Sequence, residues 1–401
     1  MWKQCLVLAT AAAAAAAAQA KILMSTGNTI VLADFDGAKF TMASQTNVSV
    51  SASWLAYAKP DRLFAVNELG SETTVFSIDL ASNTIAQKAQ AQGSRGLVHL
   101  KLSTDARRMV GAAYGNGTVD VFDVSSGGGG GGGGGIKLLK TVPSHDKPGS
   151  VVATQPSRPH QAVLDPSGRY FVVNDLGFNH ILVLDSADDA FTVLNHVPVE
   201  PAGCGPRHGA FFPVGAGTTT AGKATHYIVV CETKNLVNVY SLRYGGPKGI
   251  DFTLQQSLST FDAHHTPLAT AAAGELVIAP DNRNVYVSNR LSGTTDTIAN
   301  FRVVTGGGHA SSKCHRRRSG PSGAETKLEL VGLTSTSGKS PRMFSIAHDG
   351  QTLLIGNTEG EMAVVALKRN QDGTLPEKPV ASIAAGAFPG GKGPVFIEQI
   401  A

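Results

Sequence analysis

The sequence predicts an all-β fold, a single seven-bladed β-propeller whose ring is closed by a strand near the C-terminus. One observation is a repeat of short β-rich runs and Gly- or Asp-containing turns, recurring about every 45–70 residues without helical periodicity. The other is a strand-like run at 394–398, which is left over after the complete copies have been counted. Four short strands per repeat are typical of propeller blades. Two unrelated β-domains would leave the last run unexplained.

The clearest copy of the repeat covers residues 159–184. Its first two β-rich runs are separated by Asp165-Pro166-Ser167-Gly168. This sequence favours a tight turn, so the two runs are predicted to form a hairpin. The middle run of the copy recurs along the chain at residues 62–68, 108–114, 170–175, 227–232, 285–290 and 353–358, with a partial first copy at 22–25.

The first blade is predicted to combine strands from both ends of the chain. Its outer three strands are expected within about residues 22–43. The run at 394–398 would add the innermost strand and leave no open sheet edge. One propeller domain is therefore expected over residues 21–401.

Residues 1–20 are predicted to be a secretory signal peptide, which makes the mature protein a secreted one. Lys3 is the only charged residue, an Ala-rich apolar stretch follows it, and Ala18-Gln19-Ala20 resembles a cleavage site. The stretch is shorter than the ~20 apolar residues that a membrane-spanning helix needs. The formal net charge of +4 gives no electrostatic reason to expect nucleic acid or a membrane surface as a partner. The sequence does not predict an oligomeric state.

Other local features are expected at the surface. Nine glycines at 127–135 and a basic loop near 306–324 are predicted to lie in outer loops. Asn47 and Asn116 each begin a glycosylation sequon, as expected of a secreted glycoprotein. Cys204 and Cys231 are both expected near the same end of the fifth blade, so a disulfide between them is compatible with the fold.

One mouth of the channel is predicted to be the functional surface. The innermost strand of a blade and its neighbour are antiparallel, so the start of the first and the end of the second emerge on the same face. Titratable groups that converge on a concave surface indicate a binding or catalytic site, although any single one of them could simply hold a loop. The rim positions identified in this way are Glu68, Arg95, Tyr114, His160, Asp175, Arg207, His208, Glu232, Arg290, Arg342 and Thr358.

Four segments resemble the lactonase family, which includes propeller-type 6-phosphogluconolactonases and fungal carboxy-cis,cis-muconate cyclases. They are residues 159–170, 204–211, 287–290 and 393–396. The resemblance implies an enzyme that hydrolyses or forms a lactone without a metal or other cofactor. Similarity to the muconate cyclases implies that the catalytic residues are His160, Arg207, Glu232 and Arg290, all of which are rim positions.

The expected function is therefore that of a secreted lactonase acting on a carboxylated or sugar lactone. Arg207 and Arg290 would hold a substrate carboxylate and polarise the ring carbonyl, while either Glu232 or His160 transfers the proton. The other rim residues expected to bind substrate are Glu68, Arg95, Asp175, His208 and Arg342. Two alternatives are a lactone-forming isomerase similar to the muconate cyclases and a non-catalytic extracellular propeller that binds a ligand. The ionic character of the rim favours catalysis over docking of a protein partner.

Overall fold

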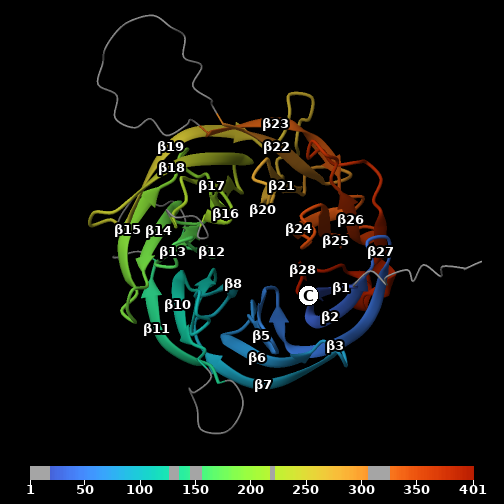
Figure 1. Ribbon diagram of the computed structural model, residues 1–401, viewed down its shortest axis with the longest axis horizontal. Coiled ribbons are helices and arrows are strands. Elements are labelled where there is room, and N and C mark those ends of the chain that lie inside the picture. The colour runs from blue at the N-terminus through green and yellow to red at the C-terminus, as the bar shows by residue number, and fades with distance from the viewer. Residues whose placement is uncertain (1–18, 126–134, 145–155, 217–221, 306–325) are drawn as a thin grey trace, which may run out of the picture.

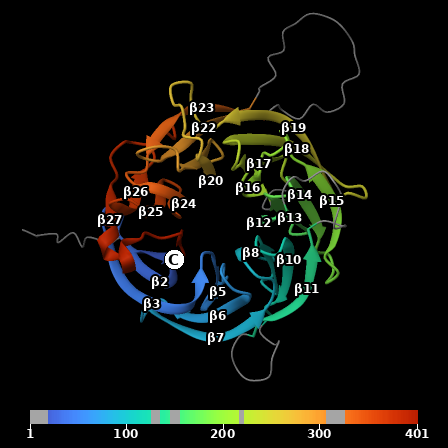
Figure 2. The same ribbon diagram turned by 180° about the vertical axis from the view of Figure 1, so that it is seen from behind.

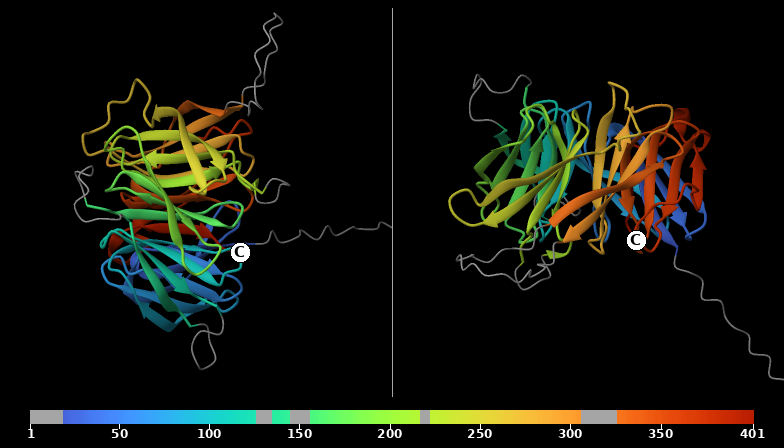
Figure 3. Two further views of the ribbon diagram at one scale, coloured as in Figure 1. Left: turned by 90° about the vertical axis from the view of Figure 1, so that its left-hand side faces the viewer. Right: turned by 90° about the horizontal axis from the view of Figure 1, so that it is seen from above.

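The seven-bladed propeller predicted from the sequence is confirmed. The computed structural model describes residues 19–125, 135–144, 156–216, 222–305 and 326–401. Within these residues, strands form seven four-stranded antiparallel sheets, arranged as blades around a central channel (Figures 1 and 2). The side views show the sheets standing next to one another around the ring (Figure 3).

We name the blades A to G in chain order, and each chain segment passes through its blade from the channel outwards. Blade A contains β1 (Ala20–Ser25), β2 (Gly27–Phe35), β3 (Phe40–Ala52) and, innermost, β28 (Phe396–Gln399). Blade B contains β4 (Leu55–Ala58), β5 (Arg62–Ala65), β6 (Glu72–Asp79) and β7 (Thr84–Gln92). Blade C contains β8 (Leu97–Leu102), β9 (Arg108–Ala113), β10 (Thr118–Asp123) and β11 (Lys137–Pro143). Blade D contains β12 (Pro159–Leu164), β13 (Tyr170–Asp175), β14 (His180–Asp185) and β15 (Thr192–Pro198).

The remaining three blades follow the same order. Blade E contains β16 (Pro206–Phe212), β17 (His226–Cys231), β18 (Leu236–Tyr244) and β19 (Ile250–Ser259). Blade F contains β20 (Ala272–Ile278), β21 (Asn284–Arg290), β22 (Thr297–Thr305) and β23 (Thr326–Ser335). Blade G contains β24 (Lys339–Ile346), β25 (Thr352–Glu359), β26 (Met362–Lys368) and β27 (Ala381–Ala384), followed by the 3-10 turns η2 (Ala385–Ala387) and η3 (Pro389–Gly391).

The continuous apolar runs of the second strands follow from how blades pack. All six residues of β13 are buried, because side chains on alternate sides of the strand enter different interfaces. Tyr170 and Val172 pack in the cluster shared with blade E, whereas Phe171 and Val173 pack in the cluster shared with blade C. Each blade thus buries both of its faces against its neighbours.

The ring closes as predicted, with β28 paired antiparallel to β1. Figure 1 shows the C-terminus beside these two strands. The backbone N–H of Lys21 also donates to the carbonyl of Ala401 at 2.9 Å. The outermost strand of blade A is longer than expected, reaching Ala52, because Val50 and Ala52 bury against blade B.

Several surface predictions can be placed on the fold. Asn47 is exposed on β3, and Asn116 is exposed in the turn after β9. The predicted glycine-rich and basic loops lie outside the described residues, except for Gly135, and so does the predicted leader before Gln19. No described helix has the length and hydropathy needed to cross a membrane.

Candidate functional site

The candidate site is built on a β-bulge that recurs at the start of the innermost strands. The pairing of β8, β12, β16, β20 and β24 with their neighbours shifts register near the rim in each of blades C to G. A bulge adds one residue to a strand and turns its side chains away from the regular alternation. The residues within the bulges include His160, Arg207, His208 and Arg342, four of the predicted rim residues, as well as Glu275.

Blades E and F place a carboxylate between two guanidinium groups. Glu232 follows the last residue of β17, and its Oε2 lies 2.7 Å from Arg207 Nε and 3.0 Å from Arg290 Nη2. Arg207 Nε nevertheless lacks hydrogen-bond geometry, since its N–H does not point at the oxygen. The contact is therefore an ion pair that leaves the donor free.

The Arg207 side chain is buried, but the described residues do not satisfy all of its hydrogen-bond donors. Its side chain is 3% exposed, and neither Nε nor Nη1 has a hydrogen-bond partner among the described residues. Burial, followed by the like charge of Arg290, lowers the pKa of Arg207 to about 9, while Glu232 opposes this shift. Unpaired buried donors of this kind favour an incoming anion or a developing oxyanion.

Aromatic rings form a layer across the channel beneath these charges. The ring centroids of Trp54 and His99 are 4.1 Å apart, those of Trp54 and His208 are 5.6 Å apart, and those of His208 and His160 are 5.1 Å apart. Phe396 of β28 packs edge-on against Trp54 at 5.2 Å. We call these five residues the aromatic floor. Trp54 packs against the apolar clusters on both sides of blade B and also lines the channel cavity.

The three histidines of the aromatic floor are held in the neutral form. Burial is the first cause of the lowered pKa of His99, His160 and His208. The nearby charge of Arg207 lowers all three pKa values further. His160 Nδ1 has no hydrogen-bond partner in the described part of the chain. Its lone pair or proton is thus available to a ligand at the rim.

Two further predicted residues join the rim through an ion pair. Arg342 Nη2 lies 2.9 Å from Glu68 Oε2, a contact that links blades G and B across the rim of blade A. The charge of Arg342 also adds to the lowering of the pKa of His160 and His208, after burial and the charge of Arg207. Three guanidinium groups therefore face two carboxylates, and an anionic ligand would balance the excess.

The remaining predicted residues lie apart from the ion-pair cluster. Asp175 is fully buried and accepts hydrogen bonds from the backbone N–H groups of Arg158 and Phe178 and from the hydroxyls of Ser144 and Ser157. This arrangement makes Asp175 a loop-holding residue. The others are placed as follows: Arg95 is exposed without an ion-pair partner in the described chain, Tyr114 packs its ring 5.9 Å from that of His160, and Thr358 donates to the carbonyl of Ser340.

A buried polar network fixes the bulge that carries Arg207. Asn174 Nδ2 donates to Gln161 Oε1 at 3.1 Å and to the carbonyl of Arg207 at 3.3 Å. Gln161 Oε1 also accepts the N–H of Gly209 at 2.7 Å, and Tyr227 donates its hydroxyl to Asn174. Blade D thereby determines the position of a site residue in blade E.

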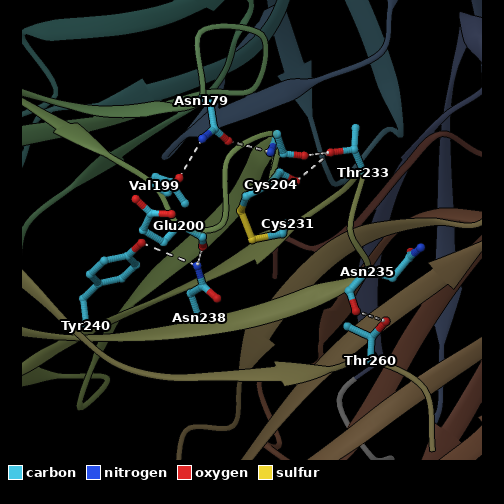
Figure 4. Close-up of a disulfide and its surroundings, with 12 residues drawn as sticks. Asn179, Val199, Glu200, Cys204, Cys231, Thr233, Asn235, Asn238, Tyr240 and Thr260 are labelled. Carbon is cyan, nitrogen blue, oxygen red and sulfur yellow. Dashed lines mark hydrogen bonds between the residues drawn. A yellow bond between two sulfur atoms is a disulfide. The ribbon is translucent and has the colours of Figure 1, made fainter. Parts of the chain in front are cut away.

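Cys204 and Cys231 form a disulfide at the rim end of blade E (Figure 4). It ties the loop before β16 to the last residue of β17, next to Glu232. The same loop is held by Thr233, which donates to the Cys204 carbonyl at 2.9 Å, and by Asn179, which accepts the Gly205 N–H at 2.9 Å. The disulfide thus braces the segments that carry Arg207 and Glu232.

Glu275 was not identified from the sequence. It is 4% exposed and accepts a hydrogen bond from His208 Nδ1 at 2.8 Å. The feature that points to Glu275 is its place in the repeat. Gly274 and Glu275 stand in the bulge of β20 where Arg207 and His208 stand in the bulge of β16. No cluster of three or more metal-ligating side chains is present in the described part of the chain.

Comparisons with known proteins agree with this architecture. A family model described as "Lactonase, 7-bladed beta-propeller" matches residues 14–320 and 321–387. The "Probable 6-phosphogluconolactonase" of Arthroderma benhamiae is 26% identical over 360 residues, covering 88% of this chain and 83% of that protein. Among solved structures, the periplasmic gluconolactonase of Pseudomonas aeruginosa superposes with a TM-score of 0.73 at 22% identity, covering 96% of this chain and 99% of that one. A Lactobacillus plantarum protein gives 0.69 at 22% identity, with coverage of 91% and 99%.

Proposed function

Since this chain belongs to the seven-bladed β-propeller lactonase family, we propose that it hydrolyses a lactone at the rim of its channel. The observation that supports this site is the buried Arg207, whose Nε and Nη1 donors lack partners among the described residues. A lactone carbonyl becomes an oxyanion when water adds to it, and preorganised donors stabilise that charge.

The proposed roles divide between binding and proton transfer. Arg207 and Arg290 bind the ring carbonyl and any carboxylate of the substrate, because guanidinium donors suit planar oxygen pairs. Glu232 orients both guanidinium groups through its Oε2. His160 is neutral, its Nδ1 has no partner in the part of the chain that the structure describes, and it accepts the proton of the attacking water.

A sugar lactone without a phosphate is the proposed substrate class, and it follows from a second proposal, export of the protein. The leader-like residues 1–20 support export, and phosphorylated sugars are products of intracellular metabolism. The names of relatives include both a gluconolactonase and a 6-phosphogluconolactonase. Mass spectrometry of protein recovered from the medium would test export. A chain starting near Lys21 is expected, and intact protein retaining Met1 would contradict it.

The test of activity is a panel of aldonolactones, their phosphorylated counterparts and muconates, assayed with the purified protein. Ring opening of an unphosphorylated aldonolactone is expected, whereas conversion of a muconate instead would favour the lactone-forming alternative. Arg207→Ala and Glu232→Gln should each lower kcat/KM about 10²–10⁴-fold. Arg243→Ala is the matched control, since Arg243 is 85% exposed and pairs with Asp251 on the outer surface. Unchanged turnover in both rim variants would reject the site.

A further inference from the structure

Glu275 and His208 connect the rim to the interior of the channel. They lie in the bulges of neighbouring blades, and their side chains are 5% and 2% exposed. Glu275 Oε1 accepts the backbone N–H of Leu276 at 3.0 Å and lies 2.8 Å from His208 Nδ1. An oxygen that already accepts one hydrogen bond is best matched by a second donor, which assigns the imidazole proton to Nδ1. His208 Nε2 is then left as an acceptor.

Glu275 borders a cavity, while its second carboxyl oxygen is buried. Oε2 has no hydrogen-bond partner among the described residues, and Glu275 lines a channel cavity of about 520 Å³. The cavity extends away from the rim, along later parts of the innermost strands such as Val163 and Val277. Lys101 and Glu398 also line it. Glu275 thus contacts an imidazole of the aromatic floor and also borders the channel cavity on the side away from the rim.

Electrostatics keep this pair neutral near pH 7. Burial raises the pKa of Glu275 to about 8, although Arg207 and Arg290 oppose the shift. Burial lowers the pKa of His208, and the charges of Arg207, Arg290 and Arg342 lower it further. Glu398 is open to the channel but surrounded by the blades, and this enclosure raises its pKa, with Lys101 opposing.

We propose that His208 and Glu275 form a proton outlet from the rim site to the channel cavity. The proposal rests on the proposed hydrolysis, which converts a lactone and water into a hydroxycarboxylate and one proton. Water adds to the carbonyl carbon and gives one proton to His160. The ring C–O bond then breaks, and the leaving alkoxide takes that proton. The new carboxylic acid releases the remaining proton when it ionises.

The outlet removes this remaining proton from a site already rich in cations. The rings of His160 and His208 are in edge-to-face contact with their centroids 5.1 Å apart, so a proton leaving His160 has His208 as its immediate neighbour. A proton enters at His208 Nε2, and the Nδ1 proton passes to Glu275 Oε1. The carboxyl group, on turning Oε2 toward the cavity, gives the Oε2 proton to water, so the charge of the pair does not change. Carboxyl rotation and tautomer exchange restore the starting state. Glu275 acts through His208 and is a positioning residue in this scheme.

Glu275→Gln tests the outlet without removing the contact. The glutamine oxygen can still accept from His208 Nδ1 and Leu276, but the side chain cannot carry a proton. We expect kcat to fall by up to about tenfold while KM stays unchanged. The pH–rate profile should lose the limb due to Glu275, and the solvent isotope effect should change. Glu329→Gln, on the exposed outer strand of the same blade, should change none of these.

Two further measurements separate the possible failures. Isotope-edited infrared spectroscopy of the resting protein should show a protonated carboxyl band at neutral pH that Glu275→Gln removes. Glu398→Gln, which leaves the aromatic floor intact, should slow turnover more mildly. Normal kcat, pH profile and isotope effect in Glu275→Gln, or no such band in an active wild-type protein, would overturn the outlet alone. A protein that shows the band but opens no lactone would overturn the proposed hydrolysis, and the outlet with it.

Discussion

At the scale of single residues, the site depends on side chains whose surroundings keep them from their usual partners. Within the described ranges, Arg207 is buried yet has donors without partners, and His160 Nδ1 also lacks a partner. Unpaired buried polar groups are costly, so the rest of the fold must hold them in place. The Asn174 network does so for the Arg207 backbone. Such groups are free to act on a ligand because the scaffold prevents them from relaxing toward each other.

Gly274 is a residue whose missing side chain makes room for the site. A Cβ at this position would lie 2.6 Å from Ser288 Oγ and 2.8 Å from Arg290 Nε. Gly274→Ala should displace the Arg290 guanidinium and lower kcat/KM about 10²-fold, as misplacement of a positioning group does. Gly332→Ala in β23 of the same blade is the control, because nothing lies within 4 Å of its Cβ. Steady-state kinetics that match for the two variants would contradict this role.

At the scale of elements, the recurrent bulge explains which parts of the site the sequence could predict. Strand ends are visible in the repeat, so the sequence alone predicts that Glu232 and Arg290 lie on the rim. Asp175 also stands at the end of a second strand, but its oxygens accept hydrogen bonds from loop N–H and hydroxyl groups. The repeat does not reveal these partners. Glu275 was missed because a register shift depends on backbone pairing rather than on residue type.

The disulfide should stabilise both the fold and the rim of blade E. Replacing Cys204 and Cys231 together by alanine removes the cross-link without leaving a single thiol. The free energy of unfolding is expected to fall by about 2–4 kcal/mol, measured by urea denaturation. A reducing agent should lower the Tm of the wild-type protein and leave that of the double variant unchanged. Equal stability of the oxidised wild type and the variant would show that the disulfide does not constrain the chain.

At the scale of the whole molecule, the buried histidines of the aromatic floor link stability to pH. His99, His160 and His208 have folded-state pKa values below 6.5, so below about pH 6.5 the unfolded chain binds protons that the folded chain rejects. Their contribution to stability is complete above this pH and declines as the pH falls, by about 1.4 kcal/mol per pH unit for each histidine.

His99→Phe should flatten this dependence while keeping an aromatic ring against Trp54. Thermal melts between pH 7 and 5 are expected to show a smaller loss of Tm in the variant than in the wild-type protein. His264→Asn is the control, because His264 is exposed. A slope for His99→Phe equal to that of the control would mean that His99 accepts protons in the folded state.

The pairing of β28 with β1 also sets the order in which the chain can finish folding. Strand β1 is synthesised long before the strand that covers its inner edge, which comes at residues 396–399. Six blades can form while synthesis continues. Blade A must wait with unpaired backbone groups along one edge, a state that invites pairing with other chains. Completion of the ring therefore waits for β28, and a product truncated before residue 396 carries an unpaired strand edge that the closed ring covers.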